Sequence, residues 1–175
     1  TWYTNCKGVL LDSAGYTLFG GTRLGSSSSP TYSSRSVMIR VDTGGVQQWA
    51  YESPSYQKYG EIDDAVQTAD GGYVYLTNGP AINLLDPQLP VAAWAGKGAV
   101  VKLDANRQVQ WMTQYGQSYT QALDHFAIKL FLQQDGKYII AGHWADTINN
   151  QRISHLNFIK YDTSGNMVWW HKHPA

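Results

Sequence analysis

The sequence predicts an all-β protein made of copies of one unit, and three observations carry that prediction. First, three segments align without a gap. They read SVMIRVDTGGVQQW (36 to 49), GAVVKLDANRQVQW (98 to 111) and LNFIKYDTSGNMVW (156 to 169). Second, the copies are spaced by about 60 residues, a period typical of repeat architectures. Third, Tyr, Trp, Val, Thr and Ser are plentiful whereas Glu occurs only twice, which favours strands over helices.

Three columns of residues recur at matching places in these segments. A basic residue lies two positions before an Asp, and a Trp lies seven positions after that Asp. The columns are Arg40, Lys102 and Lys160; Asp42, Asp104 and Asp162; and Trp49, Trp111 and Trp169. Because basic, acidic and indole positions recur together, we expect each column to have one structural role in a repeated fold.

Each unit is expected to begin with a hairpin. Residues 9 to 22 contain two short apolar runs around a turn at Ser13 to Gly15. Residues 66 to 79 and 131 to 144 are the equivalents in the other units. The hairpins share a tyrosine column, which consists of Tyr16, Tyr73 and Tyr138. Residues 1 to 8 precede the first hairpin and are expected to form an N-terminal extension or an added strand.

The aligned segments are expected to supply the third and fourth strands. Apolar residues alternate with other residues along 37 to 42, so one face of this strand should be buried. The turn that follows has an Asp that can cap its own backbone and then a position suited to positive φ. Gly45 and Gly165 suit that position. Arg107 occupies it in the second copy, so the second turn could differ.

Four strands in about 60 residues describe a β-propeller blade. The predicted fold is one repeat domain, 1 to 175, of three four-stranded antiparallel β-propeller-type blades, a partial propeller or one completed by association. The blades are expected at 9 to 61, 62 to 121 and 122 to 175. Because a blade cannot bury both faces alone, it must stack on neighbours. The column Trp, near the start of the outermost strand, is expected to cover the gap to the next blade.

At these residues the chain resembles the propeller-like tandem repeats of large secreted and cell-surface bacterial proteins. Their blades read approximately DGGY, VVAG, VVKLD, SGN and VVW, followed by Tyr-Gly. The matching segments are ADGGYVYL (69 to 76), QDGKYIIAG (134 to 142), VVKLDANRQVQWMTQYG (100 to 116) and FIKYDTSGNMVWW (158 to 170). The resemblance covers nearly the whole chain. It implies an extracellular or cell-surface location and specifies the architecture rather than a reaction.

Composition argues against several classes of partner. Charged residues make up 15% of the chain and balance to zero, so no long-range field recruits nucleic acid or anionic lipid. No apolar run approaches the roughly 18 residues of a membrane span. The single cysteine, Cys6, cannot form an internal disulfide.

The charged and ionisable residues have a structural and a functional interpretation. The pairs Arg40 with Asp42, Lys102 with Asp104 and Lys160 with Asp162 could be three equivalent ligand sites. Repetition favours ion pairs or turn caps instead. Glu61 with Asp63 or Asp64 could hydrolyse glycosides, but a similar run at 123 to 125 favours a shared structural role. The histidines, which are His125, His143, His155, His171 and His173, match no zinc spacing, so neither metal nor cofactor is expected.

A surplus of aromatic residues lies outside the repeated columns. The candidates for a ligand-binding surface are Trp94, Trp144, Trp170, Tyr56 and Tyr119. Exposed aromatic rings stack on sugars and anchor protein interfaces, so a glycan-binding or an assembly surface is predicted. The alternative is that these rings cap open blade ends.

The leading expectation is a non-catalytic extracellular structural or binding module that acts by self-association or attachment to a cell-surface assembly. A carbohydrate-binding lectin is the alternative, and a glycan-active enzyme is the third. Closed propellers have about 4 to 8 blades, whereas three are expected here. The remaining blades could come from a longer protein, from a second copy that completes six, or from an open assembly.

Overall fold

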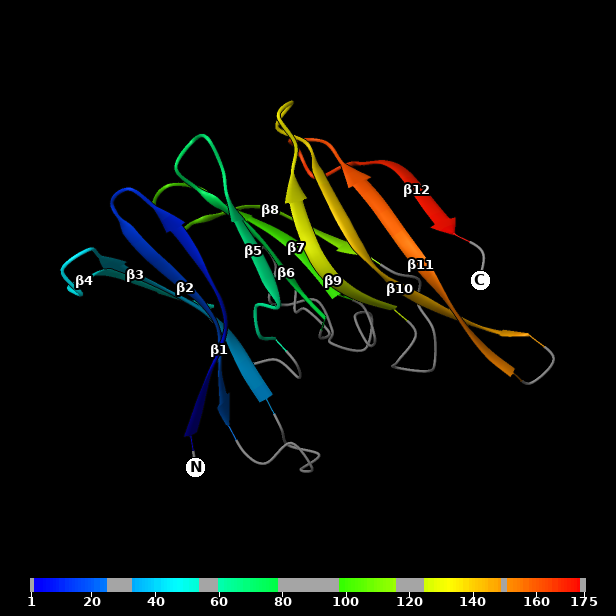
Figure 1. Cartoon of the computed structure of the whole chain (residues 1–175), viewed down its shortest axis with the longest axis horizontal. Coiled ribbons are helices and arrows are strands. Elements are labelled where there is room, and N and C mark those ends of the chain that lie inside the picture. The colour runs from blue at the N-terminus through cyan, green and yellow to red at the C-terminus, as the bar shows by residue number, and fades with distance from the viewer. Residues whose placement is uncertain are drawn as a thin grey trace.

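The computed structural model describes residues 2–24, 33–53, 60–78, 98–115, 125–148 and 151–173. This part of the chain contains strands and no helix, and the strands form three four-stranded antiparallel sheets (Figure 1). The sheets do not close into a barrel. The predicted fold class, all-β with propeller-type blades, is therefore confirmed.

Each sheet is a simple meander of consecutive strands. The first blade contains β1 (Trp2–Asp12), β2 (Gly15–Leu24), β3 (Ser33–Asp42) and β4 (Gln47–Glu52). The second contains β5 (Asp64–Gln67), β6 (Tyr73–Thr77), β7 (Gly98–Leu103) and β8 (Val109–Tyr115). The third contains β9 (His125–Leu132), β10 (Tyr138–Ile148), β11 (Gln151–Tyr161) and β12 (Met167–His173). Residues 2 to 8 are continuous with residues 9 to 12 in β1, so they belong to the first blade.

The blades form a row in chain order, with the first and third at its ends (Figure 1). The first strands of the three blades are neighbours, because β5 contacts β1 on one side and β9 on the other. Adjacent innermost strands are typical of blades arranged around the central axis of a propeller.

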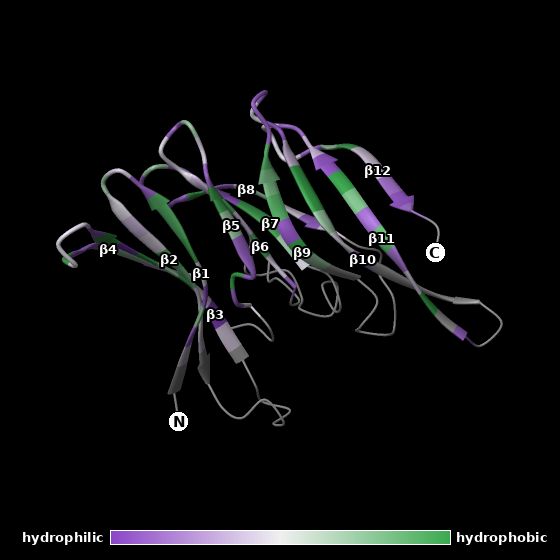
Figure 2. Ribbon diagram, viewed as in Figure 1, coloured by the Kyte–Doolittle hydropathy of each residue, from purple (hydrophilic) through white to green (hydrophobic). Residues whose placement is uncertain are grey.

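Each blade has a forward face, toward the next blade in the chain, and a rear face, toward the preceding one. Residues paired directly across antiparallel strands share a face. In the first blade the forward face carries Thr17, Phe19, Met38, Arg40, Trp49 and Tyr51. The rear face carries Val9, Leu11, Tyr16, Leu18, Val37, Ile39 and Val41. In the third blade Phe158 and Lys160 share the forward face and Ile159 lies on the rear face. Figure 2 shows apolar and polar stretches along β11.

Two hydrophobic cores fill the two junctions between blades. One joins the forward face of the first blade, including Phe19 and Met38, to the rear face of the second. The other joins the forward face of the second blade, including Val100, to the rear face of the third. Every residue of β6 and β7 is buried as a result. The second blade is therefore covered on both faces, whereas each end blade is covered by a neighbouring blade on one face.

The turn between the third and fourth strands is the same in all three blades. Gly45, Arg107 and Gly165 have φ values of 84°, 65° and 82°, and each donates its N–H to the carbonyl of the column Asp. The expectation that the second turn could differ is wrong. Arg107 adopts the left-handed conformation at a cost of about 1 to 2 kcal/mol, because the two backbone hydrogen bonds of the turn require it.

A β-bulge follows this turn at the same place in each blade. The extra residue is Gln48, Gln110 or Val168, and the next residue is the column Trp. Bulges redirect side chains and increase local twist. This one places Trp49, Trp111 and Trp169 opposite the basic column, on the forward face.

Candidate functional site

The tryptophan column packs against the tyrosine column of the next blade. The rings of Trp49 and Tyr73 have centroids 5.5 Å apart and meet at 66°. Those of Trp111 and Tyr138 are 6.0 Å apart and meet at 57°. These separations and tilts are favourable for aromatic pairs. Each of these two indoles thus covers the gap to the following blade.

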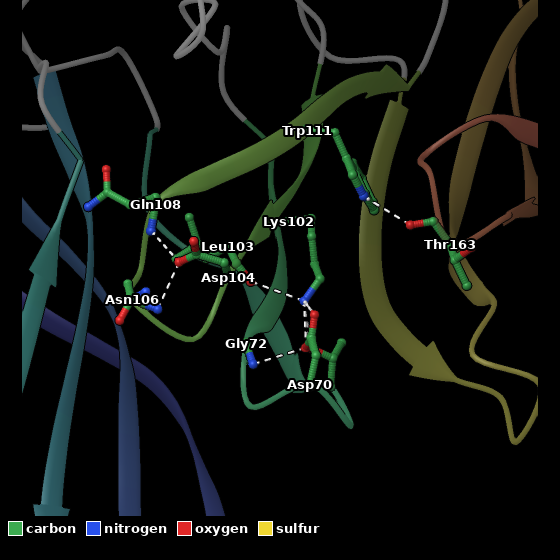
Figure 3. A network of polar contacts seen from close by, with 10 residues as sticks. Asp70, Gly72, Lys102, Leu103, Asp104, Asn106, Gln108, Trp111 and Thr163 are labelled. Atoms are coloured by element: carbon green, nitrogen blue, oxygen red, sulfur yellow. Dashed lines mark hydrogen bonds and ion pairs between the residues drawn. The ribbon is translucent and has the colours of Figure 1, made fainter.

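The turn of the following blade completes the seat of each indole. Trp111 Nε1 donates to the Thr163 carbonyl at 3.0 Å (Figure 3). A Cβ at Gly165 would lie only 2.6 Å from the Trp111 ring, so the absence of a side chain makes room for the indole. At the other junction the Arg107 guanidinium lies 5.1 Å from the centroid of the Trp49 ring, a cation–π distance.

The aspartate column caps the turn. Oδ1 of each Asp accepts two backbone N–H groups of its own turn at 2.7 to 2.9 Å, as Asp104 does in Figure 3. The donors are Gly44 and Val46 for Asp42, Asn106 and Gln108 for Asp104, and Ser164 and Asn166 for Asp162. These hydrogen bonds fix the turn on which the indole of the preceding blade packs.

The basic column pairs with a different carboxylate from the one that lies two residues later. Arg40 contacts Asp12 at 2.6 Å, Lys102 contacts Asp70 at 2.8 Å and Lys160 contacts Asp135 at 3.8 Å. Of the two structural interpretations of these pairs, ion pairs or turn caps, the contacts of the column Asp are those of a turn cap, and the ion-pair interpretation is wrong. The physical reason is that the column Asp is bound to its own turn, while the first hairpin brings another Asp beside the basic residue.

Lys102 illustrates how a residue of the basic column is held by hydrogen bonds. Its Nζ donates to Thr68 Oγ1 at 2.7 Å, to both oxygens of Asp70 at 2.9 and 2.8 Å, and to the Leu103 carbonyl at 3.1 Å (Figure 3). Lys102 is 4% exposed. Hydrogen bonds from Lys102 and Thr68 lower the pKa of Asp70 to about 2. A buried ammonium with its donors satisfied in this way has a structural role.

The carboxylates of 61 to 64 join neighbouring blades. Lys7 of the first blade lies 3.7 Å from Glu61 and 3.5 Å from Asp63. Asp64 accepts the N–H of Leu130, in the third blade, at 2.8 Å. Burial raises the pKa of Asp63, which is opposed by the charge of Lys7. These contacts support the structural interpretation of the acidic run over the catalytic one.

Asn78 is an interblade contact that the sequence did not reveal. Its Nδ2 donates to the Ala127 carbonyl at 2.7 Å and its Oδ1 accepts the Ala127 N–H at 2.9 Å. Tyr115 donates its hydroxyl to the same Oδ1 at 2.6 Å. No repeated column marks this position, because Gly21 and His143 are its equivalents in the other blades. The amide therefore serves one junction and no repeat signal could have identified it.

Most of the aromatic candidates for ligand binding fall outside the described side chains. Tyr56, Trp94 and Tyr119 lie outside the described residues, and Trp144 is described only as part of the backbone of β10. Trp170 lies on β12, is 42% exposed and donates Nε1 to Asn157 Oδ1. The structure thus places Trp170 on the surface, and the other four rings of this set lie outside the described side chains.

Large apolar side chains are exposed on the two end blades. On the first blade these are Val9, Leu11, Tyr16, Leu18 and Val46. On the third they are Ile128, Phe131, Leu132, Leu156, Met167, Val168, Trp169 and Trp170. Among its described residues the second blade exposes none. Val9, Leu11, Tyr16 and Leu18 share the rear face of the first blade, and Phe131, Leu156 and Trp169 share the forward face of the third.

The rear face of the first blade is hollowed. The hollow has a volume of about 180 Å³, and Leu18, Val37 and Ile39 supply much of its apolar lining. Cys6, the free and exposed thiol, lies at the same hollow. The hollow therefore lies on the same face as the exposed side chains of Val9, Leu11 and Tyr16.

In the part of the chain that the structure describes, no three His, Cys, Asp or Glu side chains are grouped so that they could hold a metal ion. The same residues include no helix long and apolar enough to cross a membrane. Comparisons with models of protein families, with curated proteins and with solved structures found no match to this chain.

Proposed function

We propose that this protein is a non-catalytic extracellular structural module that acts by self-association through its two open blade faces. The observation that carries the proposal is the distribution of exposed apolar residues. Large apolar side chains are exposed on the first and third blades and on no described residue of the second. The extracellular location rests on the resemblance to secreted and cell-surface repeats.

The physics of stacked repeats supports self-association. A blade is stable because each face packs on a neighbour, and terminal repeats need a polar outer face to stay soluble alone. Here the outer faces expose large apolar side chains instead, Leu18 on one and Phe131 and Trp169 on the other, where basic residues such as Lys129 also lie. Burying apolar surface releases about 25 cal/mol for each Å² removed from water, so covering these side chains would contribute favourably to association.

The use of the charged residues also supports a scaffold. Asp104 is bound to its turn, Lys102 is bound to the first hairpin, and Asp64 is bound to the next blade. Each of these groups fixes a strand, a turn or a junction. The contacts of the aspartate column and of the basic column recur in all three blades. This recurrence is expected of structural contacts, because every blade must form the same kind of junction.

Light scattering coupled to size-exclusion chromatography tests the proposal. The wild-type chain is expected to have a mass above the 19.5 kDa of one chain and to dissociate on dilution. Leu18→Lys, on the rear face of the first blade, should lower the mass to that of one chain. Gln110→Lys, an exposed position on the second blade, is the matched control and should leave the mass unchanged.

The thiol of Cys6 gives an independent readout. Because Cys6 is exposed and lies at the apolar hollow of the first blade, a thiol reagent should label it quickly in dilute protein and slowly in concentrated protein. A wild-type chain that remains monomeric at every concentration, with equally reactive Cys6 throughout, would rule out self-association.

A carbohydrate-binding lectin is the second candidate, and the exposed indole of Trp170 favours it. Aromatic faces on a protein surface stack against sugar rings. A glycan array probed with wild-type protein and with Trp170→Ala tests this function. Binding that is present in the wild type and lost in Trp170→Ala would support the lectin, whereas the structural module predicts no glycan signal from either protein.

A further inference from the structure

We propose that the partner of this chain is a second copy docked head to tail, with Trp169 of each copy packed on Tyr16 of the other. Two copies then close a ring of six blades, within the about 4 to 8 blades of closed propellers. This inference rests on the proposed self-association and names the surfaces that meet.

The two internal junctions are the template for the contact. At each, a column Trp on a forward face packs on a column Tyr on a rear face. Tyr73 and Tyr138 are each 3% exposed because an indole covers them, whereas Tyr16 is 44% exposed. Trp169 is 41% exposed at the other end of the row. The chain therefore presents both halves of the same contact, one on each end blade.

The turn of the first blade has the shape that receives an indole. Gly45 and Gly165 have φ values of 84° and 82° and the same turn hydrogen bonds. A Cβ at Gly165 would meet the Trp111 ring at 2.6 Å, whereas a Cβ at Gly45 would meet no atom within 4 Å. The seat occupied by Trp111 in the third blade is thus open in the first, next to Tyr16.

The hollow beside Tyr16 fits the aromatic residue that faces it in this arrangement. Met38 and Val100, which occupy the same column position in the first two copies of the repeat, are fully buried in the two internal junctions. Phe158 is their equivalent on the forward face of the third blade and is half-buried. An apolar cavity of about 150 Å³ holds a benzene molecule, so the hollow of about 180 Å³ can receive this phenyl ring.

Head-to-tail docking is favoured over the pairing of two identical faces. If two rear faces met, Tyr16 would lie against the rear face of the second chain, and Trp169 would stay exposed on both chains. If two forward faces met, Tyr16 and the hollow would stay exposed. Only a contact between unlike faces repeats the Trp–Tyr junction, and with two copies it occurs twice and closes the assembly.

A complementation experiment distinguishes these arrangements. Trp169→Ala and Tyr16→Ala are each made in the full chain, and their masses are measured alone and mixed by native mass spectrometry. Each variant alone should associate about tenfold or more weakly than wild type, because both junctions of its ring are damaged. The mixture should recover a heterodimer, because the Tyr16→Ala chain supplies Trp169 to the intact Tyr16 of the other chain.

A second pair keeps the test decisive if either variant folds poorly. Leu18→Lys alters the rear face of the first blade and Phe131→Lys alters the forward face of the third, and this pair should complement in the same way. Association of wild type that Trp169→Ala leaves unchanged, or the lack of a heterodimer in both mixtures, would overturn the head-to-tail contact while self-association stands. Masses beyond two chains would overturn the closed ring. A strictly monomeric wild type would overturn self-association as well.

Discussion

The indole of Trp49 meets the ring of Tyr73 at 66° with centroids 5.5 Å apart, and this pair joins the first blade to the second. The relationship recurs between Trp111 and Tyr138 at the next junction. A contact that is built twice within one chain, and whose separate halves lie exposed at the two ends, explains both the stacking of the blades and the proposed association.

The position of each Trp in the row predicts the cost of removing it. Trp111→Ala should lower the free energy of unfolding by about 3 kcal/mol, a typical loss for a packed aromatic residue, because the indole also donates to Thr163. Trp169→Ala in dilute, monomeric protein should lower it by about 0.5 kcal/mol or less, as for other surface positions. Urea unfolding of both variants measures the difference. Equal losses would contradict the assignment of Trp169 to an open face.

The two turn glycines should tolerate alanine unequally. Gly45→Ala should cost about 1 to 2 kcal/mol, because a side chain is strained in the left-handed conformation. Gly165→Ala has the same strain, and its Cβ also collides with the Trp111 ring, so it should cost about 1 to 3 kcal/mol more. Urea unfolding of dilute protein compares them. A Gly165→Ala variant as stable as Gly45→Ala would show that the indole does not occupy this seat in solution.

The ion pair between Lys102 and Asp70 should make stability depend on pH under acid conditions. The pKa of Asp70 in the folded protein is lowered from 3.8 to about 2, so the carboxylate stabilises the fold fully above about pH 4. This contribution is lost as the pH falls through about 2. Because Asp70 is half-exposed, the effect should be modest.

Asp70→Asn should therefore lose less stability than wild type between about pH 4 and pH 2, measured by urea unfolding at several pH values. Asp12 and Asp135 also have lowered pKa values, so the Asp70→Asn variant retains some acid sensitivity. In the Lys102→Met background, Asp70→Asn should change the pH dependence less, because Thr68 and the Gly72 N–H remain as hydrogen-bond donors to the carboxylate. An effect as large as in the wild-type background would mean that Lys102 is not the main partner that lowers the pKa of Asp70.

Asn78 should contribute more to stability than a surface amide that also makes hydrogen bonds. Asn78→Ala removes the partners of the Ala127 N–H and carbonyl at the junction of the second and third blades. Leaving such groups unpaired costs about 1 to 3 kcal/mol each. Asn166→Ala, which removes an exposed bond to Asp162, is the control and should cost about 0.5 kcal/mol or less. Thermal unfolding measures both, and similar losses would argue against Asn78 as a junction contact.

The repeated features of the fold were predictable because repetition is written in the sequence. The strands, the capped turn after Asp42 and the forward position of Trp49 all follow from columns that recur with fixed spacing. The turn at Arg107 was harder to predict, because the hydrogen bonds of the turn impose a left-handed backbone that arginine disfavours.

Other features depend on strand register, which the sequence does not state. The partner of Arg40 is Asp12, 28 residues away, because β1 and β3 flank β2 and bring the first turn beside the basic column. The bulge at Gln48 is likewise visible only in the pairing of β3 with β4. Asn78 belongs to no column. Interactions made once, or across strands whose pairing must first be known, therefore escaped prediction.

Sedimentation equilibrium of the wild type, Trp169→Ala and Trp170→Ala tests most directly whether the open blade faces bind each other. Trp169 and Trp170 are neighbours on β12 with similar exposure, but Trp169 faces away from the second blade and Trp170 is paired with Ile159, on the other face. The wild type and Trp170→Ala should have twice the 19.5 kDa mass of one chain, and Trp169→Ala should approach the mass of one chain. A monomeric wild type, or a Trp169→Ala protein that associates as the wild type does, would contradict the account.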